Sequence, residues 1–273
     1  MTAALVLALR LVVNQEPEAV SPGGRRYYAR PDSAGIVARA ESAAARHPDD
    51  ADTLLALGLA HAARWQYRAA VAAYTRAIAA APERAELYRH RGHRYISLRM
   101  ADRAVADLER AASLDTNRFD IWYHLGLAYY LSGRYDAAVR AYARCRAVAV
   151  TADDTVAASD WLWMSLHRAN RGAAAGVVVA QLPESAAVRE NVAYYERLLL
   201  YAGRRRALDL RARMEAGDLE FATIGYGLAN WLLVEGDTLG AHSLMREITS
   251  GPYWPAFGFI AAEEDLRRLE DHR

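Results

Sequence analysis

The chain has 273 residues, a formal net charge of +1 and one cysteine. All 34 basic residues are arginine, which excludes mechanisms that need a lysine, such as those of P-loop nucleotide hydrolases, Schiff-base enzymes and protein kinases. The balanced charge gives no field for nucleic acid or an acidic membrane, and a single cysteine excludes disulfide frameworks, zinc ribbons and iron–sulfur clusters within one chain.

Residues 1–32 are predicted to form an N-terminal apolar segment followed by a loop, with a remnant of a secretory leader as one possibility. Its first thirteen residues are apolar except for Thr2 and Arg10. This run is shorter than the about 20 residues that cross a bilayer, so no transmembrane span is predicted. Two interpretations stay open, a trimmed secretory leader and a helix packed on the first repeat. Residues 14–32 are rich in proline and glycine, which is typical of a loop or tether.

A period of 34 residues runs through the middle of the chain. Each unit contains two apolar stretches with helical spacing, which predicts a stack of antiparallel helix hairpins and an all-α fold. Small residues at equivalent positions let two helix backbones approach, and the large residues fill the gap between units. The three windows are Ala51–Pro82, Ala85–Thr116 and Phe119–Val150, and their equivalent glycines are Gly58, Gly92 and Gly126.

The stack is expected to continue beyond these windows on both sides. Ser33–Arg46 is predicted as the second helix of an incomplete leading unit, so residues 33–152 hold this half-unit and three clear units. Residues 153–273 are expected to form degenerate units and a polar capping helix, because terminal units of solenoids are atypical. The helices predicted there are Asp153–Ala169, Glu190–Tyr201, Gly225–Val234 and about Ala256–Leu269.

The repeated columns resemble the tetratricopeptide repeat. That family has an aromatic residue, a Leu-Gly pair and a Tyr on its first helix, and Ala, Phe, Ala and a final Pro around its second. The resemblance implies a right-handed superhelix whose first helices line a concave groove, and a non-catalytic scaffold that binds a protein or peptide there. The equivalent columns are Leu54, Tyr88 and Trp122; Leu57, Arg91 and Leu125; His61, Tyr95 and Tyr129; Ala70, Ala104 and Ala138; Tyr74, Leu108 and Tyr142; and Ala77, Ala111 and Cys145.

Two stretches, residues 124–130 and 254–263, are also similar to uncharacterised bacterial proteins with this repeat. This similarity slightly favours an exported, periplasmic location, with the cytoplasm as the alternative.

The candidate binding residues are expected on the first helices of the second and third units. Glu86, His90 and His93 share one helix face, and Asp120 and His124 repeat the first two positions one unit later, about 10 Å away. Three interpretations stay open: solvated acid–histidine pairs, recognition of a peptide or small molecule, and a metal or acid–base site. The other groove candidates are Arg89, Tyr123, Tyr130, Trp163, Tyr194 and Tyr226.

The preferred hypothesis is therefore a binding scaffold with no catalytic residue, metal or cofactor. The alternative is a small-molecule or metal-binding protein, or an enzyme, that uses the three histidines with Glu86 and Asp120. Cys145 replaces an alanine of the repeat and is expected to be a buried core residue. The chain is expected to be a monomer, or a weak homo-oligomer if Phe257, Phe259 and Ile260 of the final helix are exposed.

Overall fold

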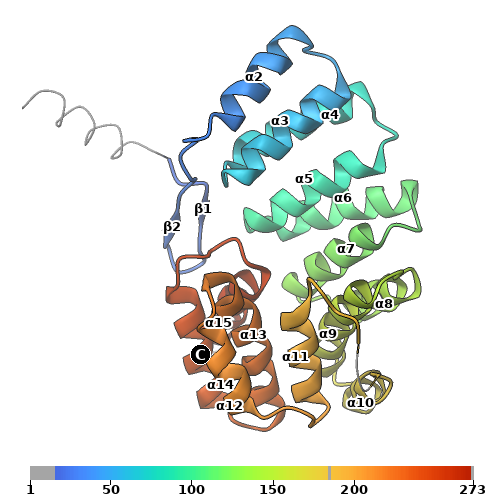
Figure 1. Ribbon diagram of the computed structural model, residues 1–273, viewed down its shortest axis with the longest axis vertical. Coiled ribbons are helices and arrows are strands. Elements are labelled where there is room, and N and C mark those ends of the chain that lie inside the picture. Colours follow the sequence, from blue (N-terminus) through green and yellow to red (C-terminus); the bar gives the residue numbers. More distant parts are fainter. Residues whose placement is uncertain (1–15, 184–185, 272–273) are drawn as a thin grey trace, which may run out of the picture.

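The computed structural model describes residues 16–183 and 186–271. These residues form an all-α superhelix with one short β-hairpin, β1 (Ala19–Val20) and β2 (Arg26–Tyr27) (Figure 1). The residues of the proposed leader lie outside this range, and the described part holds no helix that is long and apolar enough to cross a membrane. The helices are α2 (Ile36–Arg46), α3 (Ala51–Ala63), α4 (Tyr67–Ala80), α5 (Ala85–Ser97), α6 (Ala101–Leu114), α7 (Phe119–Leu131), α8 (Tyr135–Ala147), α9 (Ala152–Arg168), α10 (Gly172–Ala180), α11 (Val192–Tyr201), α12 (Ala207–Met214), α13 (Asp218–Val234), α14 (Thr238–Ser250) and α15 (Phe257–Asp271).

The three predicted hairpins are confirmed as α3–α4, α5–α6 and α7–α8. The repeated glycines lie where the two helices of each hairpin cross. A β-carbon added to Gly126 would lie 2.7 Å from the buried ring of Tyr142, closer than real β-carbons approach their neighbours. Gly92 has the same relation to Leu108, and Gly58 to Tyr74. Glycine is therefore required here by the close approach of two helices.

Outside the clear repeats the predicted helices are present with shifted ends. Helix α2 begins at Ile36 because the Asp32 carboxylate accepts hydrogen bonds from the first backbone N–H groups of the helix. Helix α13 begins seven residues before Gly225, which lies inside the helix and contacts Met214 and Ile248. The short helix α10 was not predicted.

The turn between the helices of each hairpin contains one residue with a left-handed backbone. These residues are Trp65 (φ 59°), Arg99 (φ 63°) and Gly133 (φ 74°), again 34 positions apart. Only the third is glycine, although the conformation disfavours other residues. The side chains of Trp65 and Arg99 both contact the C-terminal part of the chain, Trp65 at Tyr253 and Trp254 and Arg99 at Glu263.

The chain curves so that its C-terminal helices come back to the N-terminal repeats (Figure 1). We call residues 253–271, which contain α15, the closing segment. Trp65 packs edge-on against Tyr253 and Trp254 at 5.3 and 5.6 Å between ring centroids. Arg268 donates hydrogen bonds to the Leu131 carbonyl and, at 3.0 Å, to the Tyr135 hydroxyl. The closing segment thus follows the row of repeat turns.

The β-hairpin joins the two ends of the superhelix, between α2–α3 and α15 (Figure 1). Tyr27 is buried, stacks on Trp254 at 5.2 Å and donates a hydrogen bond to Glu263. Residues 14–32 were predicted as a loop or tether, and Tyr27 anchors the described part of this segment to the closing segment.

Candidate binding cleft

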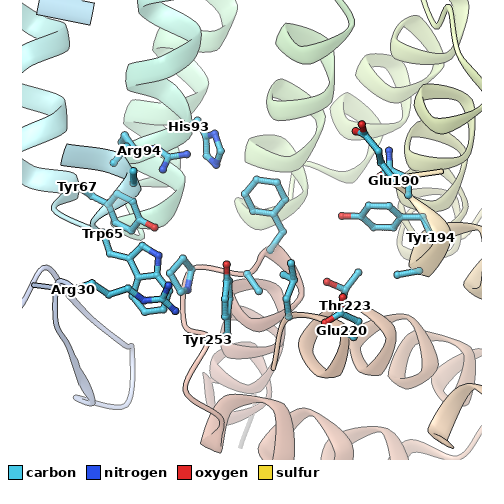
Figure 2. A pocket seen from close by; sticks show the side chains of 18 residues that line it. Arg30, Trp65, Tyr67, His93, Arg94, Glu190, Tyr194, Glu220, Thr223 and Tyr253 are labelled. Atoms are coloured by element: carbon cyan, nitrogen blue, oxygen red, sulfur yellow. The ribbon is translucent and has the colours of Figure 1, made fainter. Parts of the chain in front are cut away.

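An open cleft of about 570 Å³ lies between the N-terminal repeats and the C-terminal helices. Its residues come from α3–α5 on one side, α11 and α13 on the other, and the start of the closing segment below (Figure 2). It exists because the closing segment returns to the repeats; neither half of the chain forms it alone. The lining residues are Arg30, Ala62, Ala63, Trp65, Tyr67, His93, Arg94, Glu190, Asn191, Ala193, Tyr194, Leu219, Glu220, Thr223, Tyr253, Pro255, Ala256 and Phe257.

The repeat side of the cleft is cationic and aromatic. The Arg30 guanidinium lies 3.6 Å from the Trp65 ring centroid, and that of Arg94 lies 4.9 Å from the Tyr67 ring centroid. Within residues 16–183 and 186–271, neither guanidinium forms an ion pair with a carboxylate. Burial lowers the pKa of Arg94, since few polar groups replace the water around it.

The opposite side of the cleft is acidic. Glu190 precedes α11 and Glu220 lies in the first turn of α13, and both side chains face the cleft (Figure 2). The Tyr194 ring stands between them, and its hydroxyl lies 2.9 Å from the Tyr123 hydroxyl. Tyr123 in turn accepts a hydrogen bond from Trp161 Nε1 at 3.0 Å, so this side is held by a buried network.

Phe257 occupies the part of the concave surface where an open groove was expected. Its ring centroid lies 5.2 Å from that of His93, 5.8 Å from His124 and 6.3 Å from Tyr123. His93 still lines the cleft, whereas Tyr123 and His124 are buried beneath the closing segment. The sequence expectation of an open groove over all three residues is corrected, because the chain covers two of them itself.

The charged groove candidates are paired with one another. Arg89 Nε lies 2.9 Å from Asp120, and Glu86 lies 3.3 Å from Arg84. His90 Nε2 lies 3.1 Å from Arg89 Nη2 and 3.8 Å from Glu86, so the shorter contact makes this nitrogen an acceptor. These groups lie on the expected face but outside the lining of the cleft.

The three histidines of this face are neutral at physiological pH. Burial, with repulsion from Arg89, lowers the pKa of His90 and that of His124 to about 3. Burial also lowers the pKa of His93 well below its usual value, and the Arg94 charge acts in the same direction. Across the described residues, no three side chains of His, Cys, Asp or Glu gather closely enough to hold a metal ion. The histidines are close to one another but paired with arginine and aromatic groups.

The remaining candidates, Tyr130, Trp163 and Tyr226, are buried in the core and do not line the cleft. The Tyr130 and Tyr226 hydroxyls lie 2.8 Å apart, and Trp163 stacks on Tyr201 at 3.8 Å. Their expected exposure is corrected because the degenerate C-terminal units pack inside the curve of the repeats. Cys145 is buried, as expected.

The surface expected to join two copies is also occupied within the chain. Phe259 and Ile260 are each 1 % exposed, and Phe257 packs on the histidines. Sequence reasoning missed Arg30 and Arg94 as cleft residues. Their only local signal is position, since Arg94 follows His93 directly and Arg30 lies in the segment read as a tether.

The model of the tetratricopeptide repeat family matches residues 119–145, which span α7 and most of α8. Together with the 34-residue hairpins, this match shows that the chain contains tetratricopeptide repeats. Over 76 residues, the repeat protein is 38% identical to the small glutamine-rich tetratricopeptide repeat-containing protein 2 of Saccharomyces cerevisiae. That match spans 28% of this chain and 22% of the yeast protein.

Two solved structures are also similar to the repeat protein. The crystal structure of MamA is 21% identical, with a TM-score of 0.49 over 52% of this chain and 81% of the MamA chain. The structure of YrrB, described as a TPR protein with an unusual peptide-binding site, is 14% identical, with a TM-score of 0.49 over 86% of this chain and 98% of the YrrB chain.

Proposed function

We propose that this tetratricopeptide-repeat protein is a non-catalytic scaffold that binds a peptide segment of a partner protein in the cleft. The repeat is in general a protein-interaction architecture, and the cleft is the observation that carries the proposal. Its volume of about 570 Å³ is large enough for several side chains, and it is partly open to solvent. Aromatic and arginine side chains, which line it, are the types that contribute most to binding energy at interfaces.

The cleft supports this function better than the face that carries Glu86, His90 and Asp120. On that face the charges neutralise one another, and Phe257 covers the neighbouring His124. An enzyme built on the histidines is not favoured, because their pKa values lie far below the pH at which a general base is useful. Within the cleft, by contrast, aromatic surface and arginine charge are accessible.

A substitution that fills the cleft tests the proposal. Ala63 lines the cleft and is exposed, so Ala63→Trp places an indole in the binding space with little cost to the core. Ala45→Trp on α2 is the matched control, an equally exposed alanine outside the cleft. The chain is panned against a displayed library of random peptides, and the enriched peptides are titrated by calorimetry.

We expect peptides selected on the unaltered chain to lose at least about tenfold in affinity for Ala63→Trp and to bind Ala45→Trp unchanged. Failure to enrich any peptide, or equal affinity for the two variants, would overturn the proposal. Circular dichroism and thermal melting of both variants exclude unfolding as the cause.

A further inference from the structure

The charges in the cleft are segregated. Arg30 and Arg94 stand on the repeat side, and Glu190 and Glu220 stand on the side formed by α11 and α13 (Figure 2). Within the described residues none of the four side chains forms an ion pair. Apolar and aromatic groups, among them Phe257, line the same cleft.

Arg94 differs from the other half-buried or buried arginines around the concave side. Arg99 pairs with Glu263 at 2.7 Å, Arg168 with Asp265 at 2.6 Å, and Arg197 with Asp160 at 2.8 Å. Each of these buried guanidiniums has a carboxylate, as burial of charge requires. Among the residues that the structure describes, Arg94 contacts the face of the Tyr67 ring and has no carboxylate partner. Its N–H donors are therefore available to a ligand that enters the cleft.

The two sides cannot neutralise each other, because the open cleft separates them (Figure 2). A ligand that places a carboxylate beside the two arginines and a cation beside the two glutamates neutralises the charges on both sides of the cleft. A uniformly acidic or uniformly basic ligand satisfies one side and is repelled by the other.

We propose that the cleft selects a dipolar peptide segment, with an Asp or Glu at one end, a Lys or Arg at the other, and an apolar or aromatic residue between them. This inference rests on the proposed peptide-binding function and adds the charge pattern of the ligand. The central residue packs against Phe257 and Tyr194, and the terminal charges set the orientation of the segment in the cleft.

Defined peptides test the charge pattern by calorimetry at low and high salt. The probes have a Phe-Ala-Phe centre flanked by Glu on one side and Arg on the other, in both chain orders. Matched peptides carry Gln at every charged position, or Glu at both ends. The protein variants are Arg94→Gln, the exposed Arg30→Gln as a second variant that leaves the core untouched, and Glu220→Gln. Arg140→Gln and Glu41→Gln, exposed and away from the cleft, control for net charge.

We expect one order of the dipolar peptide to bind about tenfold more tightly than the Gln peptide, with the advantage reduced by salt. Arg94→Gln, Arg30→Gln and Glu220→Gln should each reduce that advantage, and the two control variants should keep it. If the Gln peptide binds as tightly as the dipolar ones, the charge inference is wrong while the peptide-binding function stands. Equal binding of the doubly acidic peptide also overturns it. If no peptide binds the unaltered chain, both proposals fail.

Discussion

Arg99 and Glu263 are 164 positions apart in the sequence, yet Arg99 Nη2 lies 2.7 Å from Glu263 Oε2, with side chains 7% and 4% exposed. Arg99 Nε donates a second hydrogen bond to the same oxygen at 3.0 Å, and Nη2 also donates to the Trp254 carbonyl at 3.0 Å. The Tyr27 hydroxyl donates to the same carboxylate. This carboxylate therefore joins the hairpin, a repeat turn and α15, and holds the closure that creates the cleft.

Glu263→Gln should lower the free energy of unfolding by about 3–5 kcal/mol, because it leaves the Arg99 charge buried without its partner. Arg99→Asn removes that charge while keeping a residue that tolerates the left-handed backbone. The double variant should lose less than the sum of the two single losses, by at least about 1 kcal/mol. Urea unfolding of the four proteins measures this coupling, and strictly additive losses would show that the pair does not act as a unit.

Gly126→Ala should destabilise the fold by about 1–3 kcal/mol, since its β-carbon would meet the buried ring of Tyr142 at 2.7 Å. Gly176→Ala is the matched control, an exposed glycine of α10 with no atom within 4 Å of the added carbon. It should stabilise the chain by about 0.5–1 kcal/mol through helix propensity. Thermal melting of both variants measures these changes in stability. A Gly126→Ala variant as stable as the unaltered chain would contradict the requirement for glycine where the two helices cross.

Arg197→Met should be strongly destabilising, by about 3–5 kcal/mol at neutral pH, because it leaves the Asp160 carboxylate buried alone. Arg197→Met combined with Asp160→Leu should recover much of this loss, since both charges are then gone. Burial already raises the pKa of Asp160 to about 7 against the attraction of Arg197. In Arg197→Met, the Asp160 carboxyl binds its proton more tightly in the folded state than in the unfolded state. The free energy of unfolding of this variant should therefore fall as pH rises from 5.5 to 8.

Urea unfolding at pH 5.5 and at pH 8 tests the direction of this change in the free energy of unfolding. A single variant that is less stable at pH 5.5 than at pH 8, relative to the unaltered chain, would show that Asp160 is not the buried group left unpaired. The double variant, which lacks both groups, serves as the control.

The free energy of unfolding should fall as pH drops from about 6.5 toward 3, because the unfolded chain then protonates histidines that the fold keeps neutral. His90, with its pKa lowered to about 3 by burial and by Arg89, is one source. His90→Gln keeps an acceptor for Arg89 and should reduce the loss between pH 7 and 5 by about 2 kcal/mol. His47→Gln, an exposed histidine outside this cluster, is the control. Equal pH profiles for His90→Gln and the unaltered chain would contradict the expectation.

The candidate site was only partly predictable from the sequence. The helix face that carries Glu86, His90 and His93 exists because i, i+4 and i+7 positions share one face in any helix. Of these residues, His93 alone lines the cleft. The sequence could not distinguish Arg94 from the other arginines of its helix, because its lack of a carboxylate partner depends on residues distant in the chain.

The sequence by itself determined the helix hairpins and their order. The contact between each repeat glycine and the side chain sixteen positions later is local, so a 34-residue period is enough to specify it. Only the tertiary structure decided what covers the concave side. Curvature accumulates from small rotations between successive repeats, and it brings Phe257 to His124 and Glu263 to Arg99. No local sequence pattern predicts these two contacts, because the residues that form them lie in distant parts of the superhelix.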